Sequence, residues 1–149
     1  MATQPLPSLP YTFRPTRTRV VLLTLGVLLA VSISGVGLVS DFEPSQRVAF
    51  VCTGLLALGV LCLLSRPRVT VDREGLWVVN LTTRRRLEWA EVLRVNLRSG
   101  DPWVSLDLSD GTTLAAMGIQ TGIARERAIA DARTLRALCE AYGAGDDRG

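Results

Sequence analysis

The chain has 149 residues, with 17 arginines, no lysine, no histidine, 14 acidic residues and a formal net charge of +3. This charge is too small to argue for nucleic-acid binding, and the missing histidine removes the commonest general base and the usual zinc ligand. The length leaves room for one membrane hairpin and one small domain.

Two uncharged apolar runs lie near the N-terminus, Val20–Val39 with twenty residues and Val48–Leu64 with seventeen. A helix needs about twenty apolar residues to cross the bilayer, with about seventeen as the lower limit. We therefore predict a transmembrane hairpin over residues 20–64, with an external loop over residues 40–47. No cleaved signal peptide is expected, because the first run exceeds the roughly 7–15 apolar residues of such a peptide.

Arginines flank both ends of the predicted hairpin, whereas its connecting loop has one arginine and two acids. Short arginine-rich segments stay in the cytoplasm. We therefore predict a multi-pass protein of the plasma membrane whose N- and C-termini are both cytoplasmic, with residues 1–19 as a basic cytoplasmic tail. The arginines that set this topology are Arg14, Arg17, Arg19, Arg66 and Arg68.

Small residues recur at every fourth position in each apolar run, a spacing that lets membrane helices approach closely. The two ridges pack against each other or against another protein, or they reflect the ordinary composition of membrane helices. Neither run contains an ionisable side chain other than cysteine, which favours an anchor over a transport path. The ridges consist of Gly26, Ala30 and Ser34 in the first run and Ala49, Thr53 and Ala57 in the second.

From residue 65 the pattern changes to short alternating segments separated by turn residues, which predicts antiparallel strands at hairpin spacing. Asp110–Gly111 is a strong tight-turn signal between the last two of them. Ala90–Glu91 is expected to form a short turn or one helical turn, and residues 118–122 a loop. The predicted strands are Arg68–Asp72, Leu76–Leu81, Arg84–Trp89, Val92–Arg98, Trp103–Leu108 and Thr112–Met117.

The period then switches to that of a helix over Ala124–Tyr142. Its apolar face is expected to cover the open end of the sheet, and residues 143–149 are predicted to form a flexible tail. Residues 65–142 are therefore predicted to form a small cytoplasmic α+β domain behind the membrane hairpin. The residues of the apolar face are Ile129, Ala132, Leu135, Leu138 and Tyr142.

At this point the chain resembles the bacterial pleckstrin-homology-like (PH-like) proteins, in particular the actinobacterial group named for low-molecular-weight protein antigen 6. Three segments carry the resemblance: the D-x-x-G turn at Asp72–Gly75, the L-x-W-A-E-V segment at Leu87–Val92, and the L-x-D-G-x-x-L segment at Leu108–Leu114. The resemblance implies an antiparallel PH-like barrel or sandwich capped by a C-terminal helix. It brings no catalytic motif with it.

The densest basic cluster, Arg84, Arg85 and Arg86, is either a solvated hairpin end or a contact for anionic lipid, where each arginine contributes on the order of 1 kcal/mol. Eukaryotic PH domains bind phosphoinositides through basic residues of the first hairpin, but the corresponding turn here, Asp72–Gly75, is close to neutral. Among the three tryptophans, Trp103 is the best candidate for an exposed partner contact.

No catalytic, cofactor or metal site is predicted. Three cysteines, Cys52, Cys62 and Cys139, suggest neither a disulfide framework nor a metal motif. The carboxylate pairs Glu88/Glu91 and Asp107/Asp110 are interpreted as structural. The sequence thus favours a non-catalytic membrane-anchored module that binds a protein partner or scaffolds a membrane complex, with anionic-lipid sensing as the alternative.

Overall fold

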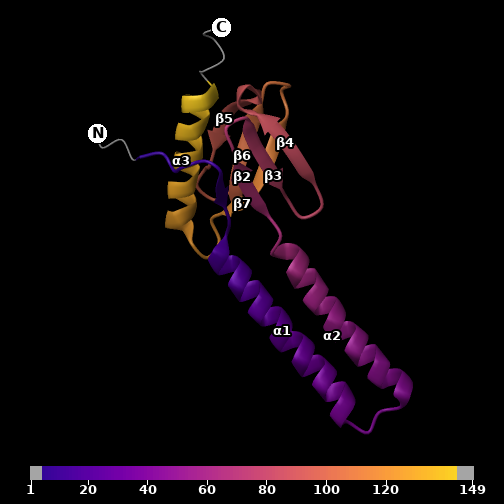
Figure 1. The fold of residues 1–149 in the computed structure, drawn as a ribbon. Helices are drawn as coiled ribbons and strands as arrows, with labels where there is room; N and C mark the ends of the chain where they lie inside the picture. Colours follow the sequence, from indigo (N-terminus) through magenta and orange to yellow (C-terminus); the bar gives the residue numbers. More distant parts are fainter. Residues whose placement is uncertain (1–4, 144–149) are drawn as a thin grey trace. The chain divides into compact units, whose positions relative to one another are not determined.

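The computed structural model describes residues 5–143, which fall into two compact units (Figure 1). One unit consists of residues 16–66 and is helical. The other combines the segment before it, residues 5–15, with residues 67–143. The helical unit is therefore an insertion in the chain of the second unit, and each is described by itself below.

The helical unit is a hairpin of α1 (Thr16–Val39) and α2 (Pro44–Leu64). Each helix begins four residues before the apolar run that predicted it, so the connection shrinks to residues 40–43. Glu43 and Gln46 form a reciprocal capping box at the start of α2, with Pro44 in the first turn. Both helices are long and apolar enough to cross a membrane.

The two helices lie close together at several small residues. Gly26, Ala30 and Gly37 are the buried residues of α1, and Gly54 is the buried residue of α2. A Cβ atom added at Gly54 would lie 2.9 Å from the carbonyl oxygen of Ala30 and 2.7 Å from the hydroxyl oxygen of Ser34. The ridge predicted on α1 therefore faces α2.

The ridge predicted on α2 does not face α1 in the same way. Ala49 and Thr53 are exposed and Ala57 is half-buried, whereas a Cβ atom at Gly26 would meet Leu58 and Leu61. The expectation that the two ridges pack against each other is wrong for α2, because its contact stripe is rotated towards Gly54 and large apolar residues. The alternative, contact of the α2 ridge with another protein, stays a prediction.

The second unit contains two antiparallel sheets and a helix (Figure 1). The sheets have the orders β1-β2-β3-β4 and β5-β6-β7, and a 3-10 turn, η1 (Trp89–Glu91), joins them. This architecture confirms the predicted fold class. The elements are β1 (Tyr11–Phe13), β2 (Arg68–Val71), β3 (Gly75–Val79), β4 (Arg84–Glu88), β5 (Val92–Asn96), β6 (Trp103–Leu108), β7 (Thr113–Gln120) and α3 (Arg125–Gly143).

The segment before the hairpin is part of the sheet. Tyr11 pairs with Val71 and Phe13 with Val69, and Phe13 is 2% exposed. The prediction of a tail over residues 1–19 is therefore wrong for β1, which is too short and too close to two prolines to show a strand pattern in sequence. Residues 1–4 and 144–149, including most of the predicted C-terminal tail, lie outside the described residues.

Strand β7 is longer than predicted, because it continues through residues 118–120, which the sequence suggests to be a loop. Gly118 is the cause of the misprediction. A Cβ atom there would lie 2.6 Å from the backbone of Arg68 and Val69. This glycine marks the place where β7 crosses closely over β2, a role that glycine often has inside strands.

The core lies between the two sheets and α3. Three residues of the predicted helix face, Ala132, Leu135 and Leu138, are buried, while Ile129 is half-buried and Tyr142 is 40% exposed. The strands contribute alternating residues to the same core. Their largest fully buried side chains are Phe13, Val69, Val71, Leu76, Val78, Leu87, Val95, Val104, Leu106 and Ile119.

Asn80 follows β3 and links the two sheets. It is 8% exposed, its side-chain amide donates to the carbonyl of Ala115 at 2.8 Å, and its side-chain oxygen accepts from the N–H of Met117 at 3.2 Å. A buried donor or acceptor that loses its partner costs about 1–3 kcal/mol. We expect Asn80→Ala to lower the free energy of unfolding by about 2 kcal/mol, measured by urea titration in detergent micelles.

The matched control for Asn80 is Thr82→Ala, in the exposed turn that follows. Surface substitutions of this kind usually change stability by less than about 0.5 kcal/mol. Equal effects of the two substitutions would contradict a structural role for the Asn80 bridge.

Candidate functional site

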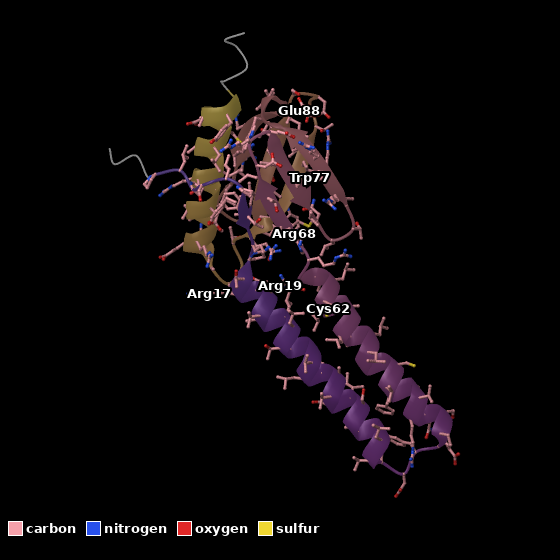
Figure 2. The ribbon with its side chains drawn as sticks, in the orientation of Figure 1. Arg17, Arg19, Cys62, Arg68, Trp77 and Glu88 are labelled. Atoms are coloured by element: carbon pink, nitrogen blue, oxygen red, sulfur yellow. The ribbon has the colours of Figure 1, made fainter. Side chains whose placement is uncertain are left out.

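The arginine cluster lies on strand β4, where successive side chains point to opposite faces. Arg84 and Arg86 lie on one face, with their guanidinium carbons 4.5 and 5.5 Å from the ring centre of Trp77 on β3. Arg85 points to the other face. Figure 2 shows Trp77 on this sheet. Two of the three consecutive arginines, Arg84 and Arg86, therefore lie over the ring of Trp77, and Arg85 lies on the opposite face of the strand.

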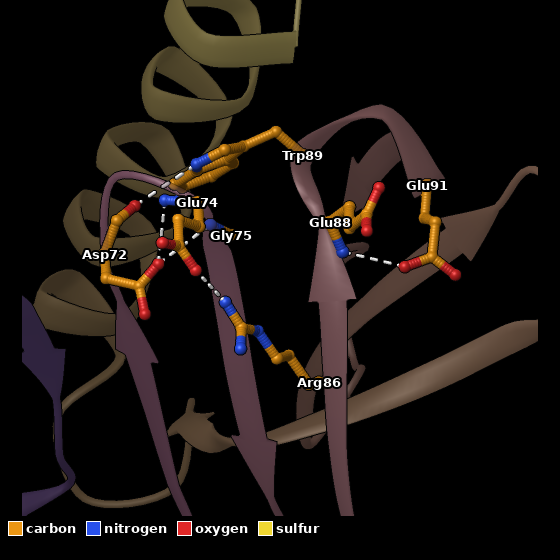
Figure 3. A network of polar contacts seen from close by, with 7 residues as sticks. All are labelled: Asp72, Glu74, Gly75, Arg86, Glu88, Trp89 and Glu91. Carbon is orange, nitrogen blue, oxygen red and sulfur yellow. Dashed lines mark hydrogen bonds and ion pairs between the residues drawn. The ribbon is translucent and has the colours of Figure 1, made fainter.

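Two of the three arginines have acidic partners. Arg85 pairs with Asp110 in the β6–β7 turn at 3.2 Å, and Arg86 pairs with Glu74 in the β2–β3 turn (Figure 3). Hydrogen bonds from Thr112 lower the pKa of the Asp110 carboxyl, and Arg85 adds to that effect. The cluster is therefore divided between two turns and does not form one uniform basic patch.

Two of the three segments that carry the family resemblance, Asp72–Gly75 and Leu87–Val92, meet at the β2–β3 turn (Figure 3). The side chain of Asp72 accepts from the N–H groups of Glu74 and Gly75, both at 2.9 Å. The indole of Trp89, which is 5% exposed, donates to the backbone carbonyl of Asp72 at 3.2 Å. This network joins the β2–β3 turn to η1.

Both carboxylate pairs are engaged in similar local contacts. Glu91 accepts from the backbone N–H of Glu88 at 2.7 Å and caps η1. Asp107 accepts from the side chains of Asn96 at 2.6 Å and Thr113 at 3.2 Å. Each pair therefore has at least one carboxylate that accepts a local hydrogen bond.

The flanking arginines are close in sequence to the two points where the chain leaves and re-enters the sheet. Phe13 pairs with Val69, so Arg14 and Arg68 lie beside one register pair. Arg68 pairs in turn with Val79, and Val79 with Arg84, so Arg68 and Arg84 lie at the same end of this sheet. Arg17 and Arg19 lie in the first turn of α1, and Arg66 directly follows α2.

Trp103, predicted to be the exposed tryptophan, begins β6 and is half-buried, opposite Gln120 of β7. It lies at a register shift of the β6–β7 ladder. Trp103 is therefore less exposed than the sequence suggests, and its role as a partner contact stays a prediction.

A surface that the sequence did not reveal runs between β5 and α3. Two open pockets of about 340 and 330 Å³ lie along it, one beside Trp89–Val95 and the other beside Leu97–Asp101. We call this surface the β5–α3 groove. Alternation in the sequence predicts β5, but it does not show which strand ends up at a sheet edge with a helix beside it.

Charge along the β5–α3 groove is predominantly basic. Four arginines line it against two acids, and one of these acids, Asp101, already accepts from the backbone N–H of Arg98 at 2.9 Å. The lining arginines are Arg94, Arg98, Arg125 and Arg136, and the other acid is Glu140.

Cys139 lines the same groove from α3, and burial raises the pKa of its thiol to about 12. Only thiolate is strongly nucleophilic. In a variant whose hairpin cysteines are alanine, we expect Cys139 to react with iodoacetamide at pH 8 at least about tenfold more slowly than in urea-unfolded protein, as measured by mass spectrometry. Equal rates in folded and unfolded protein would contradict this burial.

The same pKa shift has a consequence for stability. Between the ordinary thiol pKa of 9.0 and about 12, the unfolded chain releases the Cys139 proton while the folded chain retains it. Stability should therefore decline with rising pH across this window, and Cys139→Ala should flatten that part of the profile.

Among residues 5–143, no three histidine, cysteine, aspartate or glutamate side chains gather into a set that could hold a metal ion. The two surface features that the described residues do form are the β5–α3 groove and the face where Arg84 and Arg86 lie over Trp77.

Comparison with known proteins agrees with this geometry. A family model described as "Bacterial PH domain" matches residues 66–138. Uncharacterized proteins of Mycobacterium tuberculosis and Mycobacterium bovis are each 37% identical over 117 residues, which cover 78% of this chain and 73% of the relative. No solved structure matches the chain significantly.

Proposed function

This chain belongs to the bacterial PH domain family, and we propose that it is a membrane-anchored, non-catalytic module that binds a protein partner or scaffolds a membrane complex at the cytoplasmic face. PH-like domains are generally non-catalytic. The narrower resemblance to the antigen 6 group is part of this proposal and is supported by the three sequence segments named above.

Membrane association is supported by the two long apolar helices. Their insertion between β1 and β2 supports the proposed topology, since both ends of the hairpin continue into paired strands of one sheet. A folded sheet cannot be divided by a bilayer, so both ends would return to the same side. The flanking arginines favour the cytoplasmic side.

The observation that carries the interaction role is the β5–α3 groove. It lies along a sheet edge, and it exposes an apolar side chain, Leu93, with 68% of its surface accessible. Sheet edges and grooves beside helices are recurrent protein-recognition surfaces.

The test is affinity purification of the full-length protein from its native membrane in mild detergent, with bound proteins identified by mass spectrometry. The control contains residues 1–66 only and thus retains the hairpin without the folded sheet. We expect a stoichiometric partner that is absent from the control. A full-length protein without any domain-dependent partner would contradict the proposal.

Lipid sensing is a second candidate because Arg84, which has no acidic partner among the ion pairs of the described residues, lies over Trp77 at the end of the sheet that carries Arg68. In lipid nanodiscs, brominated anionic lipid should then quench tryptophan fluorescence at low salt and much less at 0.5 M salt. Arg84→Glu should abolish the quenching, whereas Arg133→Glu should not. Salt-independent quenching would exclude this role.

A further inference from the structure

The outer edge of β5 has backbone groups that do not pair with another strand. The sheet order β5-β6-β7 leaves β5 at an edge. The carbonyl of Val95 accepts from the Arg136 side chain on α3 at 2.8 Å, so it points away from β6. Because the N–H and C=O of one strand residue point the same way, the Val95 N–H also faces the groove.

A bulge next to this position exposes an apolar side chain. The β5–β6 register shifts between Val92 and Arg94, which leaves Leu93 as the extra residue of the bulge. Leu93 is 68% exposed and lines the groove together with the buried Trp89 and Val95. An incoming segment would thus meet backbone hydrogen-bonding groups and an apolar contact at the same place.

The charges along the edge of β5 favour an incoming segment with negative charge. Arg94 and Arg98 are exposed on or just after β5, and Arg125 and Arg136 face them from α3. Arg136 occupies the Val95 carbonyl that an added strand would need. A carboxylate on the incoming segment would attract this guanidinium and release the carbonyl for pairing.

From this geometry we propose that the β5–α3 groove binds an extended, acidic segment of a partner protein, which adds a strand to the edge of β5. Hydrogen bonds to the backbone of β5 require the bound segment to be extended, and the four arginines favour acidic side chains on it. This inference deepens the proposed function and rests on it.

The experiment places the photo-crosslinker p-benzoylphenylalanine at position 93 of the full-length chain in its native membrane. The matched control places it at position 133, an exposed position of α3 outside the groove. We expect one discrete protein adduct at position 93 and none at position 133. Mass spectrometry should map the adduct to an acidic segment of the partner.

Charge reversal and hydrogen exchange test the proposed mode of binding. Arg94→Glu should reduce the adduct about tenfold, while Arg133→Glu should leave it unchanged. In the purified complex, the β5 amides that include Val95 should exchange at least about tenfold more slowly than in the free protein.

The outcomes separate this inference from the proposed function. The groove assignment is overturned by an adduct with a second copy of this chain, a basic segment or a lipid, by an adduct that survives Arg94→Glu, or by unprotected β5 amides. It is also overturned if a domain-dependent partner co-purifies equally with the wild-type and Arg94→Glu proteins, and the proposed function then stands. If no domain-dependent partner co-purifies at all, both fail.

Discussion

Replacing Phe13 with alanine should lower the free energy of unfolding by about 3–5 kcal/mol, the usual cost of truncating a buried phenylalanine. Phe13 is 2% exposed in the core, its ring meets that of Tyr11 edge-on at 4.9 Å, and its backbone pairs with Val69. Loss of this ring would leave a cavity at the junction between β1 and the rest of the sheet. Domains of this size have a total stability of only about 5–15 kcal/mol.

The measurement is urea unfolding of the full-length protein in detergent micelles, followed by tryptophan fluorescence. All three tryptophans lie outside the hairpin, so the signal reports the sheet unit alone. Leu93→Ala is the control, because Leu93 is 68% exposed and its truncation should cost less than about 0.5 kcal/mol. If Phe13→Ala behaved like this control, β1 would not be an integral strand.

The second large effect is expected at Gly118, where alanine should lower the free energy of unfolding by about 3 kcal/mol. The added Cβ would lie 2.6 Å from the backbone of Arg68 and Val69, and a strand backbone cannot give way as a flexible side chain can. Relief requires moving β7 away from β2, which would separate the two sheets at this crossing.

Gly122→Ala provides the matched control for Gly118. No atom lies within 4 Å of a Cβ built at Gly122, and its backbone does not need glycine. The substitution should be neutral or stabilise by up to about 1 kcal/mol, since alanine restricts the unfolded chain more than glycine does. The same urea titration compares the two variants, and an equally small effect of both would rule out the close crossing.

The insertion of the hairpin between β1 and β2 links the predictions on stability and topology. Destabilising β1 would leave the sheet unit attached to the hairpin through β2 alone.

In a reporter-fusion experiment, we expect a C-terminal reporter to behave as cytoplasmic and a reporter between Asp41 and Pro44 as external. The reverse pattern would contradict the proposed topology.

Much of the architecture was predictable because it depends on local pattern. The apolar runs predicted both helices of the hairpin, and alternation predicted six of the seven strands to within a few residues. The period of the last helix also identified Ala132, Leu135 and Leu138 as its core residues. Each of these features depends on the order of apolar and polar residues along a short segment. That order decides which residues of the segment can be buried, so it can be recognised from the sequence.

The errors arose where distant parts of the chain meet. β1 has three residues, and only its pairing with β2, across more than fifty intervening residues, makes it a strand. A glycine at position 118 suggests a loop in the sequence. In the structure it lies inside β7, where the backbone of β2 comes so close that no side chain fits. On α2, the contact stripe depends on how the partner helix is rotated, which spacing alone does not specify.

The candidate site divides in the same way. The sequence by itself determined that the chain carries an apolar hairpin, a small antiparallel domain and a dense arginine cluster, because composition and period are local quantities. Only the tertiary structure decided that Arg85 and Arg86 are held by Asp110 and Glu74, and that β5 lies at an open edge beside α3. Which charges are paired and which backbone groups stay accessible depends on contacts between segments far apart in the chain, and folding alone brings those segments together.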